Sequence, residues 1–101
     1  MKLKFAPQAH QDLRAARAWW KKNRDKAPQL LRDELKRAFA LLKTQRFVGE
    51  VALDPGAEGL RRFYLHGTRY FIYYEIHDDD VEVLRLWHAS RGESPTLRPK
   101  P

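Results

Sequence analysis

The chain has 101 residues, 43% apolar and 12% aromatic, which is the composition of one globular domain rather than of a disordered segment. It has no cysteine, which excludes a disulfide framework and a thiolate metal site and fits a reducing, cytoplasmic setting. No apolar run is long enough for a signal peptide or a membrane span, so we expect a soluble protein. The formal net charge of +7 favours an acidic partner, whether nucleic acid, ribosome or protein.

The first part of the chain predicts a short strand and two amphipathic helices. Residues 2–5 alternate polar and apolar side chains, and Pro7 suits the first turn of a helix. Asp25 is a candidate cap for the second helix, whose first turn tolerates Pro28. Apolar side chains recur at helical spacing in two stripes, Ala9, Leu13, Ala16 and Trp20, then Leu31, Leu35, Ala38 and Leu42. Helices joined this tightly predict an antiparallel hairpin.

Two segments lack periodicity. Residues 47–59 include Gly49, Pro55 and Gly56, so we predict a surface loop that leads to the sheet. Residues 93–101 are rich in proline and predict a weakly ordered tail. The folded domain is therefore expected to span residues 1–92.

Residues 60–91 read as three consecutive antiparallel strands. Gly67-Thr68 is predicted to form a two-residue type II′ turn, which pairs His66 with Arg69 and Phe63 with Ile72.

The turn at residues 78–80 sets the second register. A two-residue loop would place Glu75 opposite Glu82, with like charges in contact, and Arg85 among the apolar side chains. We therefore prefer a three-residue loop. That loop pairs His77 with Val81, Ile72 with Leu86 and Tyr70 with His88.

This register predicts an α+β fold, β-α-α-β-β-β, with the helical hairpin packed on a small, mainly antiparallel sheet. The face under the helices should carry Phe63, Leu65, Ile72, Tyr74, Ile76, Leu84 and Leu86. The other face should carry Arg62, Tyr64, His66, Arg69, Phe71, Tyr73, Arg85 and Trp87. Interleaved arginine and aromatic side chains suit a phosphate-bearing, base-stacking ligand, although arginine stems also lie over rings on ordinary solvated sheets. Since so aromatic a face is unusual on a monomer, we expect a partner to bury it.

Antiparallel geometry brings the start of the second strand beside the end of the third, so Arg69, His88 and Arg91 are expected to converge. Arginine supplies fixed-charge donors for phosphate, and histidine exchanges a proton near neutral pH. Together they would meet the minimum for metal-independent RNA cleavage, although each is also common as an ordinary strand-end residue. Trp19 and Trp20 are adjacent and cannot both point inward, which leaves Trp19 half-covered or at an interface. The histidines show no metal-ligand spacing, so we expect neither a metal nor a cofactor.

The chain resembles the RelE/ParE toxin superfamily of type II toxin–antitoxin modules over residues 1–92. Three motifs carry the resemblance: Phe5-x-Pro7-x-Ala9-x-x-Asp12-Leu13, Gly67-x-Arg69-Tyr70-x-Ile72-Tyr73-Tyr74 and Val83-Leu84-Arg85-Leu86-Trp87-His88-Ala89-Ser90-Arg91. The last motif is more similar to ParE-type sequences, in which a His followed three residues later by Arg ends the final strand. Ala89 stands where glycine is usual, and Gly92-Glu93 where aspartate is usual.

The resemblance implies two kinds of target. RelE-type members are ribosome-dependent mRNA endonucleases, whereas ParE-type members inhibit DNA gyrase and need no catalytic residues. By position, Arg62 and Arg69 match basic residues of RelE-type active faces. Tyr64 stands where a second basic residue is common, and Arg91 lies near the closing one. No Tyr or His follows His88, although several RelE-type nucleases use one there, and this favours the ParE type.

We therefore predict a growth-inhibiting toxin of the kind associated with plasmid stabilization, acting through gyrase. A small, acidic cognate antitoxin would wrap the domain and hide its basic surface, with a homodimer or a heterotetramer as a further assembly. Contacts to partner or nucleic acid would involve Trp19, Arg62, Tyr64, Tyr73, Arg85 and Trp87. The alternatives are a RelE-like endonuclease acting on ribosome-bound mRNA, with Arg69, His88 and Arg91 as catalytic residues, and a non-toxic nucleic-acid-binding module or degenerate toxin.

Overall fold

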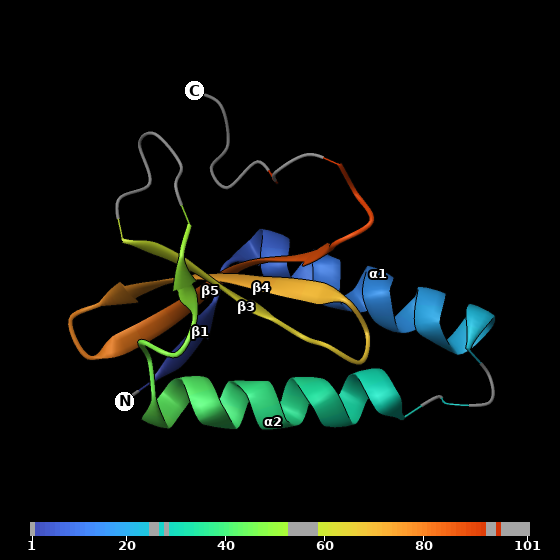
Figure 1. Cartoon of the computed structure of the whole chain (residues 1–101), viewed down its shortest axis with the longest axis horizontal. Helices are drawn as coiled ribbons and strands as arrows, with labels where there is room; N and C mark the ends of the chain where they lie inside the picture. The colour runs from blue at the N-terminus through green and yellow to red at the C-terminus, as the bar shows by residue number, and fades with distance from the viewer. Residues whose placement is uncertain (1, 25–26, 28, 53–58, 93–94, 96–101) are drawn as a thin grey trace.

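The structure, a computed structural model, describes residues 2–24, 27, 29–52, 59–92 and 95. Two helices accompany a five-stranded mixed sheet with strand order β1-β5-β4-β3-β2 (Figure 1). The elements are β1 (Leu3–Phe5), α1 (Pro7–Asn23), α2 (Leu30–Thr44), β2 (Glu50–Val51), β3 (Leu60–Tyr64), β4 (Tyr70–His77) and β5 (Asp80–His88). Among the strands of the described residues, β1 alone pairs in parallel, with β5, so the predicted α+β class and the mainly antiparallel sheet are confirmed. Neither helix carries an apolar stretch of the length that a bilayer crossing requires.

Both predicted helical stripes are buried in one hydrophobic core. Trp20 points inward, as only one of the adjacent tryptophans can, and its indole Nε1 donates to the Ala27 carbonyl oxygen over 2.7 Å. α2 begins at Leu30, later than predicted, and the expected cap and first-turn proline at positions 25 and 28 lie outside the described residues. The core comprises Ala9, Leu13, Ala16, Trp20, Leu31, Leu35, Ala38, Leu42, Leu65, Tyr70, Ile72, Tyr74, Val81, Val83 and Leu86.

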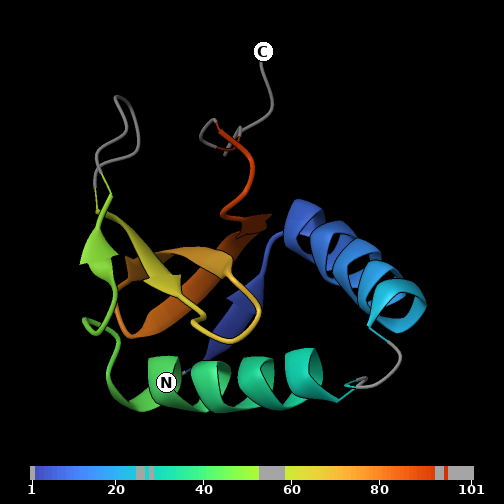
Figure 2. The same cartoon turned by 45° about the vertical axis from the view of Figure 1, so that its right-hand side comes forward.

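The helices take different positions relative to the sheet. α2 runs along one face of the sheet, and α1 lies beside β5 (Figure 2). β1 pairs with β5 only from Val81 to Val83, so the remaining edge of β5 faces α1 instead. This arrangement allows a side chain of α1 to satisfy the backbone of β5 beyond the point where β1 ends.

A β-bulge splits the β4–β5 register in two. From the open end to Tyr73↔Arg85 the pairing follows the three-residue loop, so the predicted Ile72↔Leu86 and Tyr70↔His88 pairs are confirmed. Beyond the bulge the register shifts by one, and His77 pairs with Asp80. The predicted pairing of His77 with Val81 was therefore wrong. The extra residue also rotates Leu84 away from the main core, where it was wrongly predicted, so that Val81 and Val83 face the helices.

The β3–β4 turn also differs from the prediction. The Phe63↔Ile72 pair is confirmed, but the strands close at Leu65, whose amide donates to the Tyr70 carbonyl over 2.8 Å. The turn therefore has four residues, and the left-handed conformation falls on Arg69, at φ 66°, instead of on Gly67. At Gly67 the backbone instead approaches α2 closely, and a Cβ there would lie 2.8 Å from a carboxylate oxygen of Glu34.

The predicted loop over residues 47–59 contains a strand. β2 pairs antiparallel with β3, with Glu50 opposite Arg62, and the ion pair between these side chains joins Nε to Oε1 over 2.5 Å. The buried Tyr74 hydroxyl anchors the approach to β2: it accepts from the Gly49 amide over 2.9 Å and donates to the Arg46 carbonyl over 2.8 Å. Residues 53–58 of the predicted loop lie outside the described residues.

The second face of the sheet has its own small core. It contains Leu60, Tyr73, Leu84 and Trp87, with Ala6, Ala52 and Phe71 packed against it. Tyr73 and Trp87 are only 5% and 8% exposed in the isolated chain, so at these two residues the expectation that a partner buries this face is corrected: the chain buries them itself. The bulge contributes to this outcome because it turns Leu84 toward this face.

Candidate functional site

A cavity lies between α1 and the open end of β4 and β5. It has a volume of about 330 Å³ and is lined by Asp12, Ala15, Ala16, Trp19, Tyr70, Leu86, His88, Ser90 and Arg91. Trp19 remains 46% exposed at this cavity, as expected for the outward member of the tryptophan pair. The small alanines of α1 leave room for an occupant, while Trp19 offers a large apolar contact and Arg91 a positive charge.

His88 lines this cavity, on the side that faces Tyr70. The two rings meet edge to face, with centroids 4.9 Å apart. The imidazole Nδ1 accepts from the Ser90 amide over 3.1 Å and lies 2.7 Å from the Ser90 hydroxyl. Since Nδ1 is an acceptor, a neutral His88 carries its proton on Nε2. Burial raises the pKa of the Tyr70 hydroxyl, and the charge of Arg91, which lines the same cavity, acts in the opposite direction.

Arg91 also reaches the second face of the sheet. Its guanidinium lies 4.1 Å from the centroid of the Trp87 ring, and that of Arg85 lies 5.0 Å from the same ring. A second, shallower cavity of about 260 Å³ follows this face, lined by Arg62, Phe71, Tyr73, Trp87, Ala89, Arg91 and Gly92. Arg91 is therefore an exposed residue that lines both cavities.

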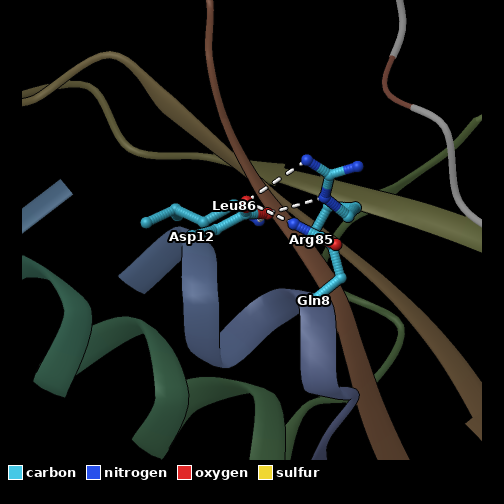
Figure 3. A network of polar contacts seen from close by, with 4 residues as sticks. All are labelled: Gln8, Asp12, Arg85 and Leu86. Carbon is cyan, nitrogen blue, oxygen red and sulfur yellow. Dashed lines mark hydrogen bonds and ion pairs between the residues drawn. The ribbon is translucent and has the colours of Figure 1, made fainter. Parts of the chain in front are cut away.

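Asp12 holds Arg85 and the edge of β5 together (Figure 3). Its Oδ2 accepts from Arg85 Nε over 2.7 Å and from the Leu86 amide over 3.0 Å, and its Oδ1 lies 3.2 Å from Arg85 Nη2. The Arg85 and Asp12 side chains are 11% and 13% exposed. Arg85, which the sequence placed among the binding residues, is thus engaged by α1 as a buried structural cation.

Arg62 and Tyr64 lie on the accessible part of β3. The Arg62 guanidinium is 4.6 Å from the Phe71 ring centroid, and hydrogen bonding to the Tyr73 hydroxyl, together with the ion pair to Glu50, raises the pKa of Arg62 above its ordinary value. The Tyr64 ring packs against both Phe71 and His66, with centroids 4.9 and 4.8 Å away. These contacts form a half-buried row of rings that ends at the β3–β4 turn.

Arg69 joins the site through its backbone only. Its carbonyl oxygen accepts from the Ala89 amide over 2.8 Å, so the expected meeting of β4 with the end of β5 is present. Its side chain is exposed and lines neither of the two cavities, whereas His88 and Arg91 share one. Of the three side chains predicted to converge, only those of His88 and Arg91 do so. Arg69 is the last residue of the four-residue turn, and its left-handed backbone directs its side chain elsewhere.

Two residues that organise the site escaped the sequence reasoning. Asp12 was noticed only as part of a motif, although an acidic residue that borders the apolar stripe of a helix, three residues after Ala9 and four before Ala16, is a signal for a buried partner. Glu34 on α2 accepts from the amides of Gly67 and Thr68 over 2.7 and 2.9 Å and from the Thr68 hydroxyl over 2.5 Å. It fixes the turn before Arg69, and a contact between residues so far apart in sequence leaves no local signal.

Comparison with known proteins identifies the class to which this fold and these motifs belong. The sequence model of the ParE toxin of type II toxin–antitoxin systems, parDE, matches residues 3–92. The chain therefore belongs to the ParE toxin family, within the RelE/ParE superfamily, and it is the toxin of a type II toxin–antitoxin system. No curated protein sequence matches it.

Solved structures share the fold at low sequence identity. The chromosomal ParDE system from P. aeruginosa aligns with a TM-score of 0.68 at 16% identity, covering 87% of this chain and 95% of that one. The intact E. coli RelBE complex aligns at 0.61 with 18% identity, covering 89% and 98%. The E. coli DinJ-YafQ complex aligns at 0.61 with 16% identity, covering 90% and 98%. These likenesses extend over nearly the whole domain and include both branches of the superfamily.

Proposed function

We propose that this toxin acts as ParE-type toxins do, by inhibiting DNA gyrase, and that a cognate antitoxin neutralises it. A metal-independent ribonuclease needs its phosphate-binding cations and its acid or base close together, and the observation that carries the proposal is that these groups lie apart in this chain. The Arg69 side chain lines neither cavity, and the Nδ1 of His88 is engaged by Ser90. Two further cations of the sheet, Arg62 and Arg85, are held by carboxylates of the chain itself.

A gyrase inhibitor requires a contact surface instead of a reactive centre. Trp19, half exposed beside the 330 Å³ cavity, and Arg91, at its rim, supply an apolar anchor and a charge that suit a protein partner. Arg62 and Tyr64 extend this surface along β3. The buried Tyr73, Arg85 and Trp87 support it from beneath rather than contacting the partner directly.

The proposed antitoxin is a small acidic protein. The net charge of +7 favours such a partner electrostatically, and the RelBE and DinJ-YafQ structures are themselves toxin–antitoxin complexes. Binding of the antitoxin over Trp19 and Arg91 would hide the surface through which the toxin acts.

A ribosome-dependent mRNA endonuclease is the second candidate. The observation that favours it is the shallow cavity on the second face, where Arg62 lies over Phe71 and Arg91 over Trp87, because cation and ring pairs of this kind suit a nucleotide. In that function Arg69 and Arg91 would bind the scissile phosphate, and His88 would be the acid or base.

Induced expression in a bacterium separates the candidates. We expect growth arrest with altered plasmid topology, an induced DNA-damage response and intact mRNA, and rescue when the neighbouring antitoxin gene is co-expressed. Arg91→Ala and Trp19→Ala should weaken toxicity, whereas Arg14→Ala, on an exposed position of the same helix as Trp19, should not. Transcript cleavage without DNA damage would exclude the gyrase proposal in favour of the endonuclease. Normal growth on induction, with antitoxin binding retained, would indicate a degenerate toxin.

A further inference from the structure

Three metal-binding side chains meet at the other end of the β4–β5 hairpin, next to its tight turn. Glu75 and His77 are two residues apart on β4 and so share a face, and Glu82 lies directly opposite Glu75 on β5. The His77 Nε2 lies 3.4 Å from Glu75 Oε1 and 3.2 Å from Glu82 Oε1. One ligand atom from each of the three residues falls within 4.8 Å of the others.

The two distances from the His77 imidazole to the carboxylates suit a single small ion. Zinc binds histidine nitrogen and carboxylate oxygen at about 2.0–2.2 Å, so two ligand atoms of a tetrahedral site lie roughly 3.3–3.6 Å apart. The two distances from His77 Nε2 match or nearly match this edge length. Small side-chain rotations of the exposed His77 and the half-buried Glu82 would complete the geometry around the fixed Glu75.

The β-bulge creates this cluster. In the register that holds at the open end of the hairpin, Glu75 would face Val83 and His77 would face Val81. After the shift between Tyr73 and Tyr74, Glu75 faces Glu82 instead. Bulges re-aim side chains, and this one brings the two carboxylates together on the face that also carries the His77 imidazole.

Burial increases the electrostatic cost. The Glu75 side chain is 7% exposed, and burying a carboxylate costs free energy, which a bound cation offsets. The neighbouring cation on β1, Lys4, stands opposite Glu82 in the ladder, but its Nζ lies 3.0 Å from Asp80 Oδ2. The charge of Lys4 is therefore directed at Asp80.

We propose that Glu75, His77 and Glu82 bind one divalent transition-metal ion, with Zn²⁺ the best fit. The imidazole favours zinc over the hard ions magnesium and calcium, and the carboxylates supply the charge. Three protein ligands leave a further position for water or for a side chain of a partner. The ion ties β4 to β5 beside the small core of Leu60, Tyr73 and Leu84, and it does not depend on whether the toxin acts on gyrase or on mRNA.

The test uses the full-length chain, stripped with a chelator and titrated with Zn²⁺ by calorimetry. We expect one ion per chain and a rise in Tm on adding zinc, because an ion that binds only the folded state stabilises it. At a free zinc concentration of about one hundred times Kd the rise should be on the order of 10 °C. Binding of Co²⁺ in place of zinc should give visible absorption bands that report coordination by the imidazole.

Variants assign the ligands. His77→Gln and Glu82→Gln replace side chains that are 55% and 34% exposed, so both should fold, and each should lose the zinc-dependent rise in Tm and the cobalt spectrum. His10→Gln, at an exposed histidine of α1, should keep both. Each variant is compared with itself in chelator and in zinc, so a change in intrinsic stability does not enter the comparison.

Two results would overturn the proposal. Equal Tm values of the wild type in chelator and in zinc would show that the three side chains interact only with one another and bind no ion. Zinc binding that survives in His77→Gln, or that disappears in His10→Gln, would place the ion elsewhere on the chain.

Discussion

Replacing Asp12 by asparagine should strongly destabilise this domain, because Asp12 couples α1 to the edge of β5. In the wild type its carboxylate accepts four hydrogen bonds, two from Arg85, one from the Leu86 amide and a long one, over 3.5 Å, from Gln8 Nε2. Asparagine has nearly the same shape and keeps one oxygen for the Leu86 amide. It removes the negative charge that faces the buried Arg85 guanidinium.

The magnitude follows from burial. Breaking a buried ion pair from one side costs about 3–5 kcal/mol, and both side chains here are less than one-seventh exposed. Because asparagine retains one acceptor and Arg85 keeps its contact with the Trp87 ring, we expect the lower end, about 3 kcal/mol. Stabilities of small domains are about 5–15 kcal/mol, so this is a large fraction of the total. The expected fall in Tm is roughly 12–24 °C.

Urea unfolding of the wild type and of Asp12→Asn measures this free energy directly. Asp33→Asn, at an exposed position in the first turn of α2, is the matched control and should change the free energy of unfolding by less than about 1 kcal/mol. The double variant Asp12→Asn with Arg85→Gln should recover part of the loss, since it removes both charges. A loss below about 1 kcal/mol for Asp12→Asn would refute the reasoning, because the pair would then behave as a surface ion pair.

Three further predictions concern the turns and the edge of the sheet. Glu34→Gln should cost about 1–3 kcal/mol and speed hydrogen exchange at the Gly67 and Thr68 amides; unchanged exchange there would contradict the clamp on this turn. Tyr74→Phe should destabilise by a similar amount, since it leaves the buried Gly49 amide without its acceptor, and equal urea midpoints for variant and wild type would contradict this. Hydrogen bonding from Lys4 lowers the pKa of the Asp80 carboxyl, so this group stabilises the fold above its unfolded pKa, and the contribution is lost as pH falls through the folded pKa. Lys4→Gln should therefore flatten the fall of stability in the acid range below about pH 4, which thermal melts at a series of pH values would measure.

The helices and the inner strands were predictable because their signals are local. Ala9, Leu13, Ala16 and Trp20 recur at the helical period, and all four are buried where that spacing predicts. The Phe63↔Ile72 and Ile72↔Leu86 pairs follow from hydrophobic alternation along the strands. An apolar stripe on a helix can be buried against any apolar surface of the fold, so its burial is predictable without knowing which surface covers it.

The turns and the edges were not predictable from such signals. Gly67 suggested a type II′ turn, but Glu34, brought from α2, accepts both amides of a longer turn and moves the left-handed residue to Arg69. In the β4–β5 hairpin each of the two loop lengths considered gives the correct register for part of the strands, since the bulge joins one register to the other. A bulge has no fixed residue type outside its glycine form, so the spacing of apolar residues alone did not reveal it.

The sequence by itself determined the order of elements, the residues of the main core and membership of the toxin superfamily, because each rests on periodicity or on short motifs. The tertiary structure decided how the charges are used. It places Arg85 under Asp12, leaves Arg91 at the rim beside Trp19, and sets Glu75 opposite Glu82 beside His77. These assignments depend on contacts between residues as much as 73 positions apart, and distance and burial, which no local pattern encodes, settle which charge each side chain meets.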